Sequence, residues 1–244
     1  KVAYSDDAGH TWLHDSTDLP LDVGGQFGES GAIEPVVVER NDGRVWMVIR
    51  TPYGIFYESF SDDGRVWSSP EPTAFKASNA PAQVTRLSDG RLVLIWNHSV
   101  GPPFRDGYIS YARQVLNAAI SSDDGKTWHG YREVVRLRPT DAPDDHVRYP
   151  MLVEMSDGRL LLSFNCVAVH PRRSWYEYTV LDPDRLTETT DRDDFTAGLD
   201  GWSLTGVSGV AIERVDGAQA LSLRRSGTGP LGATRNFPYG PSGT

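Results

Sequence analysis

The acidic residues that most suggest chemistry lie in the short segment SSDDGKTW, residues 121–128. Asp123 and Asp124 stand among hydroxyl side chains and a glycine, a combination typical of catalytic loops and of metal sites. A calcium loop that begins with D-x-D-G needs further oxygen ligands downstream, and the glutamate expected at the end of such a loop is absent. The sequence therefore predicts no metal site, and we expect no cofactor.

The same box occurs three times, which favours a structural role. SDDAGHTW spans residues 5–12 and FSDDGRVW spans residues 60–67. Aligned on the tryptophan, Asp7, Asp62 and Asp123 are equivalent and are spaced by 55 and 61 residues. An aspartate can bond its own backbone two residues on, glycine takes a positive φ, and tryptophan buries a large apolar surface. The boxes are predicted to be hairpin turns, and their spacing is that of propeller blades.

A second repeat interleaves with the first and supplies the remaining strands. NDGRVWMVIR at residues 41–50, SDGRLVLIWN at 88–97 and SDGRLLLSFN at 156–165 each place a D-G-R turn before an apolar run. Another apolar run precedes each turn, and a strand, an Asp-Gly turn and a strand form a strong hairpin signal. Each unit is thus predicted to be a four-stranded antiparallel blade, with the Asp box joining its last two strands.

Three blades are predicted, at about residues 31–72, 77–138 and 147–186, and the first Asp box is the tail of a fourth. The last blade has no recognisable Asp box, and VAVHPRRSWYEYTVLD at 167–182 is predicted to supply its outer strands. About three and a half blades do not close a ring, because propellers have four to eight. We therefore expect upstream blades, in a removed segment or in another chain.

The composition and apolar pattern of the sequence change after the last blade. Residues 1–186 are predicted to be the partial propeller, and the polar residues 187–192 a linker. Residues 193–244 have short alternating runs and many glycines, and they resemble the start of a jelly-roll or concanavalin-like module that binds carbohydrate. A β segment that only caps an edge is the alternative.

Composition agrees with an all-β protein. The 244 residues include 24 Gly, 16 Pro, 7 Trp and 10 Tyr, and no long amphipathic helix is apparent. The net charge of −9 argues against nucleic acid as a partner. No apolar run approaches the roughly 20 residues of a membrane-spanning helix. The single cysteine, Cys166, is predicted to be a buried free thiol.

The register of the D-G-R turns points to a site. Eight residues before each turn aspartate stand Glu34, Pro81 and Tyr149, and eight residues after it stand Arg50, Asn97 and Asn165. Equivalent positions lie at the same height around a propeller axis. Glu34 and Tyr149 are therefore expected to face each other across the central mouth. Arg50 ends an apolar strand, so its charge is expected to have a partner.

These residues resemble the sialidases (neuraminidases) with Asp-box, or BNR, repeats, and in particular bacterial exo-sialidases on a six-bladed β-propeller. Residues 34–50, EPVVVERNDGRVWMVIR, are similar to the family's glutamate-to-arginine segment. Residues 112–128, which include Arg113, are similar to the segment that carries another triad arginine. Residues 148–164, RYPMLVEMSDGRLLLSF, are similar to the nucleophile strand. The resemblance covers residues 1–186.

The resemblance implies a retaining exo-α-sialidase that takes terminal sialic acid from glycoconjugates. Tyr149 would be the nucleophile and Glu34 the base that activates it. A neutral tyrosine suits an anomeric carbon that carries a carboxylate, and sialidases are a tyrosine exception among glycosidases. Arg50 and Arg113 would clamp the substrate carboxylate, which a guanidinium matches with two hydrogen bonds.

Further consequences of the resemblance concern the surroundings of this pair. His146 and Arg148 flank Tyr149, where either can touch substrate. The family's third clamp arginine and its acid/base aspartate belong to early blades and have no counterpart in this chain. The protein is expected to be secreted or on the cell surface, and bacterial.

One position departs from the family pattern and leaves alternatives open. The strand after the nucleophile usually ends in an acid that holds a clamp arginine, whereas here it ends in Asn165. A relative that cleaves another sugar, such as a rhamnosidase, is therefore one alternative. A polysaccharide lyase that uses Tyr or His as its acid/base is another. A third is a lectin-like propeller that only binds glycans.

Overall fold

The structure is a computed structural model that describes residues 2–14, 19, 21, 32–98, 104–105, 108–109, 112–138, 141–142, 145–188, 199, 202–205, 207–215, 218–225 and 232–235. The chain divides into two compact units, Lys1–Glu188 and Thr189–Thr244. Of the predicted linker, only residues 187 and 188 lie among the described residues, so its bounds stay a prediction. No helix in the described part is long and apolar enough to cross a membrane.

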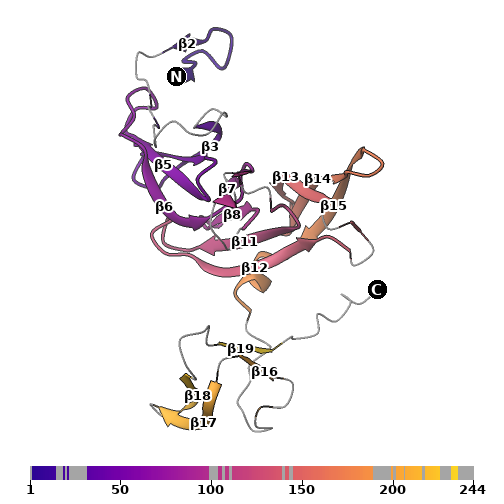
Figure 1. The fold of residues 1–244 in the computed structure, drawn as a ribbon. Coiled ribbons are helices and arrows are strands. Elements are labelled where there is room, and N and C mark those ends of the chain that lie inside the picture. The colour runs from indigo at the N-terminus through magenta and orange to yellow at the C-terminus, as the bar shows by residue number, and fades with distance from the viewer. Residues whose placement is uncertain are drawn as a thin grey trace. The chain divides into compact units, whose positions relative to one another are not determined.

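The first complete blade is an antiparallel sheet whose strands follow one another in sequence order (Figure 1). It consists of β3 (Ile33–Glu39), β4 (Val45–Arg50), β5 (Ile55–Ser61) and β6 (Glu71–Lys76). The D-G-R turn joins β3 to β4, and the Asp box joins β5 to β6. This is the predicted order of strands and turns.

The second blade repeats this order with a long insertion. Its strands are β7 (Gln83–Arg86), β8 (Leu92–Trp96), β11 (Val115–Ser121) and β12 (His129–Arg136). The insertion between β8 and β11 contains a short hairpin of β9 (Phe104–Arg105) and β10 (Tyr108–Ile109). The third Asp box joins β11 to β12, as predicted.

The third sheet has three strands, β13 (His146–Glu154), β14 (Leu160–Ala168) and β15 (Arg173–Leu181), followed by the 3-10 helix η1 (Pro183–Leu186). The sequence analysis predicted that residues 167–182 supply more than one outer strand, and this prediction was wrong. That segment contains the end of β14, a turn and the single strand β15.

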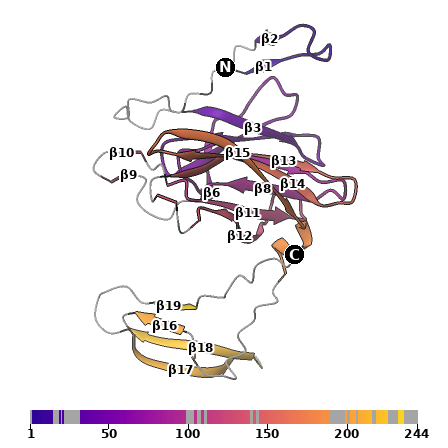
Figure 2. The ribbon, with the colours of Figure 1, turned by 90° about the vertical axis from the view of Figure 1, so that its right-hand side faces the viewer.

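The remaining strands form separate pairs. At the N-terminal end, β1 (Ala3–Tyr4) and β2 (Leu13–His14) flank the first Asp box. In the C-terminal unit, β16 (Trp202–Thr205) pairs with β19 (Gly232–Arg235), and β17 (Val207–Val215) pairs with β18 (Ala218–Arg225) (Figure 2). The predicted jelly-roll or concanavalin-like nature of this unit stays a prediction.

The D-G-R turns are alike in all three blades because each aspartate bonds its own arginine. In the first, Asp42 Oδ2 accepts hydrogen bonds from Arg44 Nε at 3.0 Å and Nη2 at 2.9 Å. Gly43 has φ of 84°, a conformation that other residues rarely adopt. Asp89 with Arg91 and Asp157 with Arg159 repeat the arrangement.

The hydrophobic core lies between the blades. Along the second strand of each blade, alternate residues face the following blade and the preceding blade. Counting from the D-G-R arginine, Trp46 and Val48 at the second and fourth positions pack against blade two. Val93 and Ile95, at the same positions of blade two, pack against blade three. Odd positions face the preceding blade, for example Leu94 and Trp96 towards blade one, and Leu160, Leu162 and Phe164 towards blade two.

The Asp boxes are turns in which the aspartate collects hydrogen bonds from its own loop. Asp123 Oδ1 accepts from Ser121 Oγ and from the Thr127 amide, both at 2.8 Å, and Oδ2 accepts from Thr127 Oγ1 at 2.6 Å. The bonds from the Thr127 side chain and amide lower the pKa of Asp123 to about 2. In the first box Thr11 does the same for Asp7, whose pKa is also about 2.

The second box corrects the sequence alignment. Asp63, rather than Asp62, accepts hydrogen bonds from Ser61 Oγ at 3.1 Å and from the Arg65 and Val66 amides at 2.8 Å. The box is one residue shorter between its serine and its tryptophan than the other two, so counting back from the tryptophan reached the wrong aspartate.

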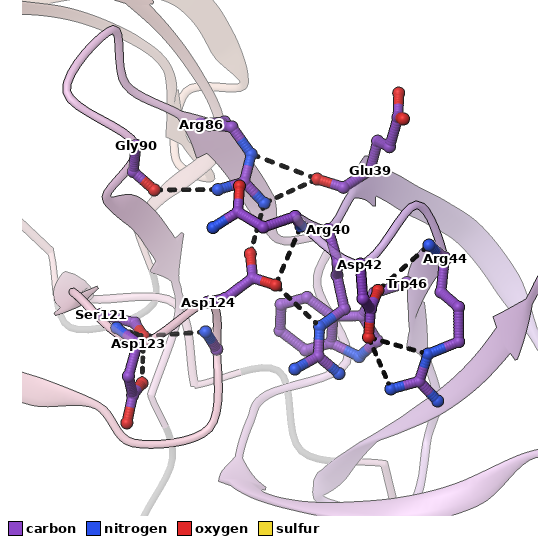
Figure 3. Close-up of polar contacts among 12 residues, drawn as sticks. Glu39, Arg40, Asp42, Arg44, Trp46, Arg86, Gly90, Ser121, Asp123 and Asp124 are labelled. Atoms are coloured by element: carbon purple, nitrogen blue, oxygen red, sulfur yellow. Dashed lines mark hydrogen bonds and ion pairs between the residues drawn. The ribbon is translucent and has the colours of Figure 1, made fainter.

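Asp124, the second acid of the third box, ties blade two to blade one (Figure 3). Its carboxylate accepts from Arg86 Nη2 at 2.5 Å and from the Asn41 amide at 2.9 Å, and it lies 3.5 Å from Arg40 Nε. Burial alone would raise the pKa of Asp124, but the Arg86 guanidinium and the Asn41 amide outweigh it and the pKa is lowered. The acids that most suggested chemistry therefore have structural partners.

Candidate active site

Glu34 and Tyr149 occupy equivalent bulges on the first strands of two blades. The pairing of β3 with β4 shifts between Ile33 and Val36, and the pairing of β13 with β14 shifts between Arg148 and Met151. At these bulges Glu34 has φ of 45° and Tyr149 has φ of 53°. Positive φ is uncommon for residues other than glycine, and such strain is concentrated at functional sites. Bulges also re-aim side chains next to active sites.

The two bulges bring the side chains together. Tyr149 Oη donates a hydrogen bond of 3.2 Å to Glu34 Oε1. The other carboxylate oxygen, Glu34 Oε2, forms an ion pair with Arg50 Nη1. The side chain of Glu34 is 41% exposed, whereas that of Arg50 is 7% exposed. Glu34 thus links a buried cation to a phenol at the surface of the mouth.

The two predicted clamp arginines converge on Asn79. Arg50 Nε donates to Asn79 Oδ1 at 2.7 Å, and Arg113 Nη2 donates to the Asn79 carbonyl oxygen. All three residues are buried. A buried guanidinium needs hydrogen-bond partners, and Asn79 supplies one to each arginine. Sequence reasoning missed Asn79, although it lies two residues before Pro81, the counterpart of Glu34 and Tyr149 in blade two.

A cavity of about 400 Å³ opens where the first strands of the three blades meet. The predicted register holds here, because Glu34, Pro81 and Tyr149 all line it. The other lining residues are Pro35, Val36, Ala82, Gln83, Pro150, Met151 and Tyr176. Tyr176 was also missed by the sequence analysis, because it comes from β15, outside the repeated motifs. The cavity can hold a sugar ring against a phenol and a carboxylate.

Arg148 and His146 flank Tyr149 in the sequence, but the structure places them at different sites. The Arg148 guanidinium carbon is 5.1 Å from the centroid of the Tyr149 ring, and Arg148 Nε donates to Asn165 Oδ1 at 3.2 Å. His146 lines a separate cavity of about 40 Å³, beside Arg138. The structure therefore brings Arg148 to the nucleophile candidate and does not bring His146 to the cavity of Glu34 and Tyr149.

A polar cavity of about 350 Å³ lies at the opposite ends of the strands, between the D-G-R turns of blades two and three. Its acids include Asp89 and Asp157, which are paired with Arg91 and Arg159. Within the described residues, no group of three or more His, Cys, Asp or Glu is arranged to hold a metal ion.

Comparison with known proteins identifies the repeats. A sequence profile of the BNR repeat-like domain family matches residues 1–162. This chain belongs to the BNR repeat-like domain family. The predicted recognition of an Asp-box family is thus confirmed. No curated protein sequence matches the chain.

Solved structures show which propeller type this BNR-repeat chain has. The intramolecular trans-sialidase of Ruminococcus gnavus is 22% identical, with a TM-score of 0.56 over 77% of this chain and 38% of that one. The NanB sialidase of Streptococcus pneumoniae is 19% identical, with a TM-score of 0.55 over 76% of this chain and 27% of that one. The Trypanosoma rangeli sialidase is 15% identical, with a TM-score of 0.50 over 75% and 27%.

These likenesses confirm the predicted fold, a partial β-propeller of the sialidase type. The BNR-repeat chain spans between 27% and 38% of the length of these solved structures. At this identity they show the fold alone, and the reaction must be argued from the site itself.

Proposed function

We propose that this BNR-repeat chain carries part of the active site of a retaining exo-α-sialidase, which releases terminal sialic acid from glycoconjugates. The observation that carries the proposal is the hydrogen bond of 3.2 Å from Tyr149 Oη to Glu34 Oε1 at a cavity in the propeller mouth. A phenol that donates directly to a carboxylate has the arrangement of an activated nucleophile and its base.

The chemistry follows from the charge of the substrate. Sialic acid carries a carboxylate on its anomeric carbon, which repels an anionic nucleophile, so a neutral tyrosine is favoured. Glu34 accepts the proton of Tyr149 as the phenol oxygen attacks the anomeric carbon and the bond to the aglycone breaks. Water then attacks the anomeric carbon of the covalent glycosyl–tyrosine intermediate and the bond to the tyrosine oxygen breaks, so the two inversions together give a product of retained configuration.

Arg50 and Arg113 are the proposed carboxylate clamp. Both are buried and share Asn79 as a partner, so two positive charges are held close together, and Arg50 also pairs with Glu34 of the cavity lining. Guanidinium groups match a carboxylate with paired hydrogen bonds, and burial strengthens the attraction. His146 is not part of this proposal, because it lines another cavity.

We further propose that additional blades complete the ring and supply the acid/base aspartate and the third clamp arginine. The support is the far face of β13–β15, where Leu161 occupies the second position after the D-G-R arginine. In blades one and two this position packs against the next blade. Here the face is open: Met151, Val153, Leu161, Tyr178 and Val180 are between 37% and 68% exposed. A further blade is the occupant that the repeated packing predicts.

Two further expectations follow from the proposed substrate. Sialoglycoconjugates are carried on cell surfaces and secreted proteins, so the protein is proposed to be secreted or to work at a cell surface. The unit at residues 189–244 is proposed to bind carbohydrate, which would hold the enzyme near its substrate.

A glycan-binding propeller without catalysis is the second candidate, and Asn165 is the observation that favours it. Where an acid would hold a clamp arginine, Asn165 instead holds Arg148. A Tyr149→Phe variant of the protein with its ring complete separates the two candidates. An enzyme loses sialoside turnover by about 10³-fold or more, while its affinity for oseltamivir carboxylate stays within about threefold. A wild-type protein that binds this ligand without turnover would instead be a lectin.

A further inference from the structure

The side chains of Arg148 and Tyr149 stack although they are neighbours along β13. On a regular strand such neighbours point to opposite faces of the sheet. The bulge removes this alternation, because Arg148 pairs with Asn165 and Met151 pairs with Ser163, which leaves two residues of β13 opposite one of β14. At 5.1 Å, the Arg148 guanidinium carbon is within cation–π range of the Tyr149 ring.

Asn165 fixes Arg148 in this position without cancelling its charge. Asn165 Oδ1 accepts from Arg148 Nε at 3.2 Å, while Nδ2 donates to Ser174 Oγ at 2.8 Å and to the Trp175 carbonyl at 3.0 Å. Both ends of the amide are therefore engaged, with the oxygen towards Arg148. Among the described residues no carboxylate pairs with Arg148, so its positive charge acts on the ring beside it.

We infer that Arg148 is a positioning residue for Tyr149. The positive charge of Arg148 stabilises the phenolate that forms when Glu34 takes the hydroxyl proton of Tyr149. The inference rests on the proposed function and assigns Arg148 a task other than binding substrate. In this step the proton moves from Tyr149 Oη to Glu34, the phenol oxygen bonds to the anomeric carbon, and the leaving group departs with its bonding electrons.

The stabilisation is realised during the reaction rather than on binding. A neutral phenol ring attracts the Arg148 cation weakly, whereas a ring that shares the negative charge of a phenolate attracts it more strongly. Interactions that strengthen on the way to the transition state raise kcat, whereas interactions with the substrate itself lower KM. The two roles of Arg148 therefore have different kinetic signatures.

Three variants test the inference in the protein with its ring complete. Arg148→Met keeps the length of the side chain and removes the charge, and we expect kcat to fall about tenfold with KM within twofold. Arg148→Lys should recover most of kcat. Asn165→Asp gives Arg148 a carboxylate partner that offsets its charge and loses the Nδ2 donor to Ser174 and Trp175, so kcat should again fall. Arg173→Met, which removes the cation 5.9 Å from the Trp175 ring on the same sheet, is the matched control.

A second readout does not depend on sialidase activity. Acetylation of the Tyr149 phenol by N-acetylimidazole can be followed by peptide mass spectrometry, with the exposed Tyr131 on β12 as internal reference. Arg148→Met and Asn165→Asp should both slow acetylation of Tyr149 several-fold relative to Tyr131. This result would stand even if the substrate were not a sialoside.

Two outcomes would overturn the inference. If Arg148→Met raises KM and leaves kcat unchanged, Arg148 contacts the substrate. If Asn165→Asp matches the wild type in both kcat and acetylation rate, Asn165 has only a structural role and the charge on Arg148 does not act on Tyr149.

Discussion

Asn79 is the residue on which both buried arginines depend. It gives its side-chain oxygen to Arg50 and its carbonyl oxygen to Arg113, while Arg50 also reaches Glu34. The side-chain contact is the one that a substitution can remove, because the carbonyl remains with any residue. Asn79 therefore sets where the Arg50 guanidinium lies relative to the carboxylate that it is proposed to bind.

We predict that Asn79→Ala weakens the binding of oseltamivir carboxylate by about tenfold, because Arg50 loses a buried hydrogen bond and with it a fixed orientation. Asn79→Asp keeps an acceptor at the same place but adds a negative charge beside both arginines, so it should also weaken the binding of this anionic ligand. Calorimetry gives the affinities, and thermal melting shows whether each variant is folded. Equal affinities for wild type and a folded Asn79→Ala variant would remove Asn79 from the site.

The residues that could be found from the sequence are those that repeat. Glu34 and Tyr149 were predicted because they stand eight residues before a D-G-R aspartate, and the structure places them in contact. Asn79 and Tyr176 could not be found in this way, because neither belongs to a repeated motif. The approach of Arg148 to the Tyr149 ring depends on a bulge, and a bulge changes the register that sequence counting assumes.

At the scale of elements, the Asp boxes hold the outer hairpins through short loops of hydrogen bonds. The sequence predicted that the boxes form turns, but it could not predict which aspartate of the second box accepts the hydrogen bonds of the loop. Loop length varies by one residue among the boxes, and only the geometry shows that Asp63 takes the place of Asp7 and Asp123.

The second box provides its own matched pair of variants. We predict that Asp63→Ala lowers the melting temperature, because the Arg65 and Val66 amides lose their acceptor. Asp62→Ala, one residue earlier, should leave the melting temperature unchanged. Differential scanning calorimetry on the two variants decides between the aspartates. A larger loss for Asp62→Ala would restore the alignment based on the tryptophan.

The first and third boxes predict a loss of stability in acid. The pKa values of Asp7 and Asp123 are about 2 in the folded state, below the roughly 3.9 of an unfolded aspartate. Folding thus favours the ionised form, so this stabilisation is fully present above about pH 4 and is lost as the pH falls towards 2. Urea unfolding at several pH values should show a weaker pH dependence for Asp123→Ala than for wild type. Identical pH dependence would contradict the assigned turn bonds.

For the whole propeller unit, the alternation of side chains along the second strand of each blade decides which face of the blade packs on which neighbouring blade. Leu162 faces blade two and is fully buried, whereas Leu161 faces away and is 37% exposed. The sequence predicted the blades and the need for more of them. It could not assign the faces, because both leucines lie in one apolar run, LLLSF, with no alternation.

We predict that Leu162→Asp destabilises the chain by about 3–5 kcal/mol, because it buries a charge without a partner. Leu161→Asp should change the stability of the chain by less than about 1 kcal/mol. In a ring closed by a further blade, however, Leu161→Asp should prevent that blade from docking. Urea denaturation and sedimentation measure the two effects. Equal destabilisation by both variants would show that the assignment of Leu162 to the buried face and Leu161 to the open face is wrong.

The most direct test of the central proposal is covalent labelling of the nucleophile. The protein with its ring complete is incubated with 2,3-difluorosialic acid, and its peptides are analysed by mass spectrometry. We predict a glycosyl adduct on Tyr149, formed more slowly in Glu34→Gln and absent in Tyr149→Phe, which should also lose sialoside turnover. An adduct on another residue, or wild-type turnover by Tyr149→Phe, would contradict the assignment of Tyr149 as the nucleophile activated by Glu34.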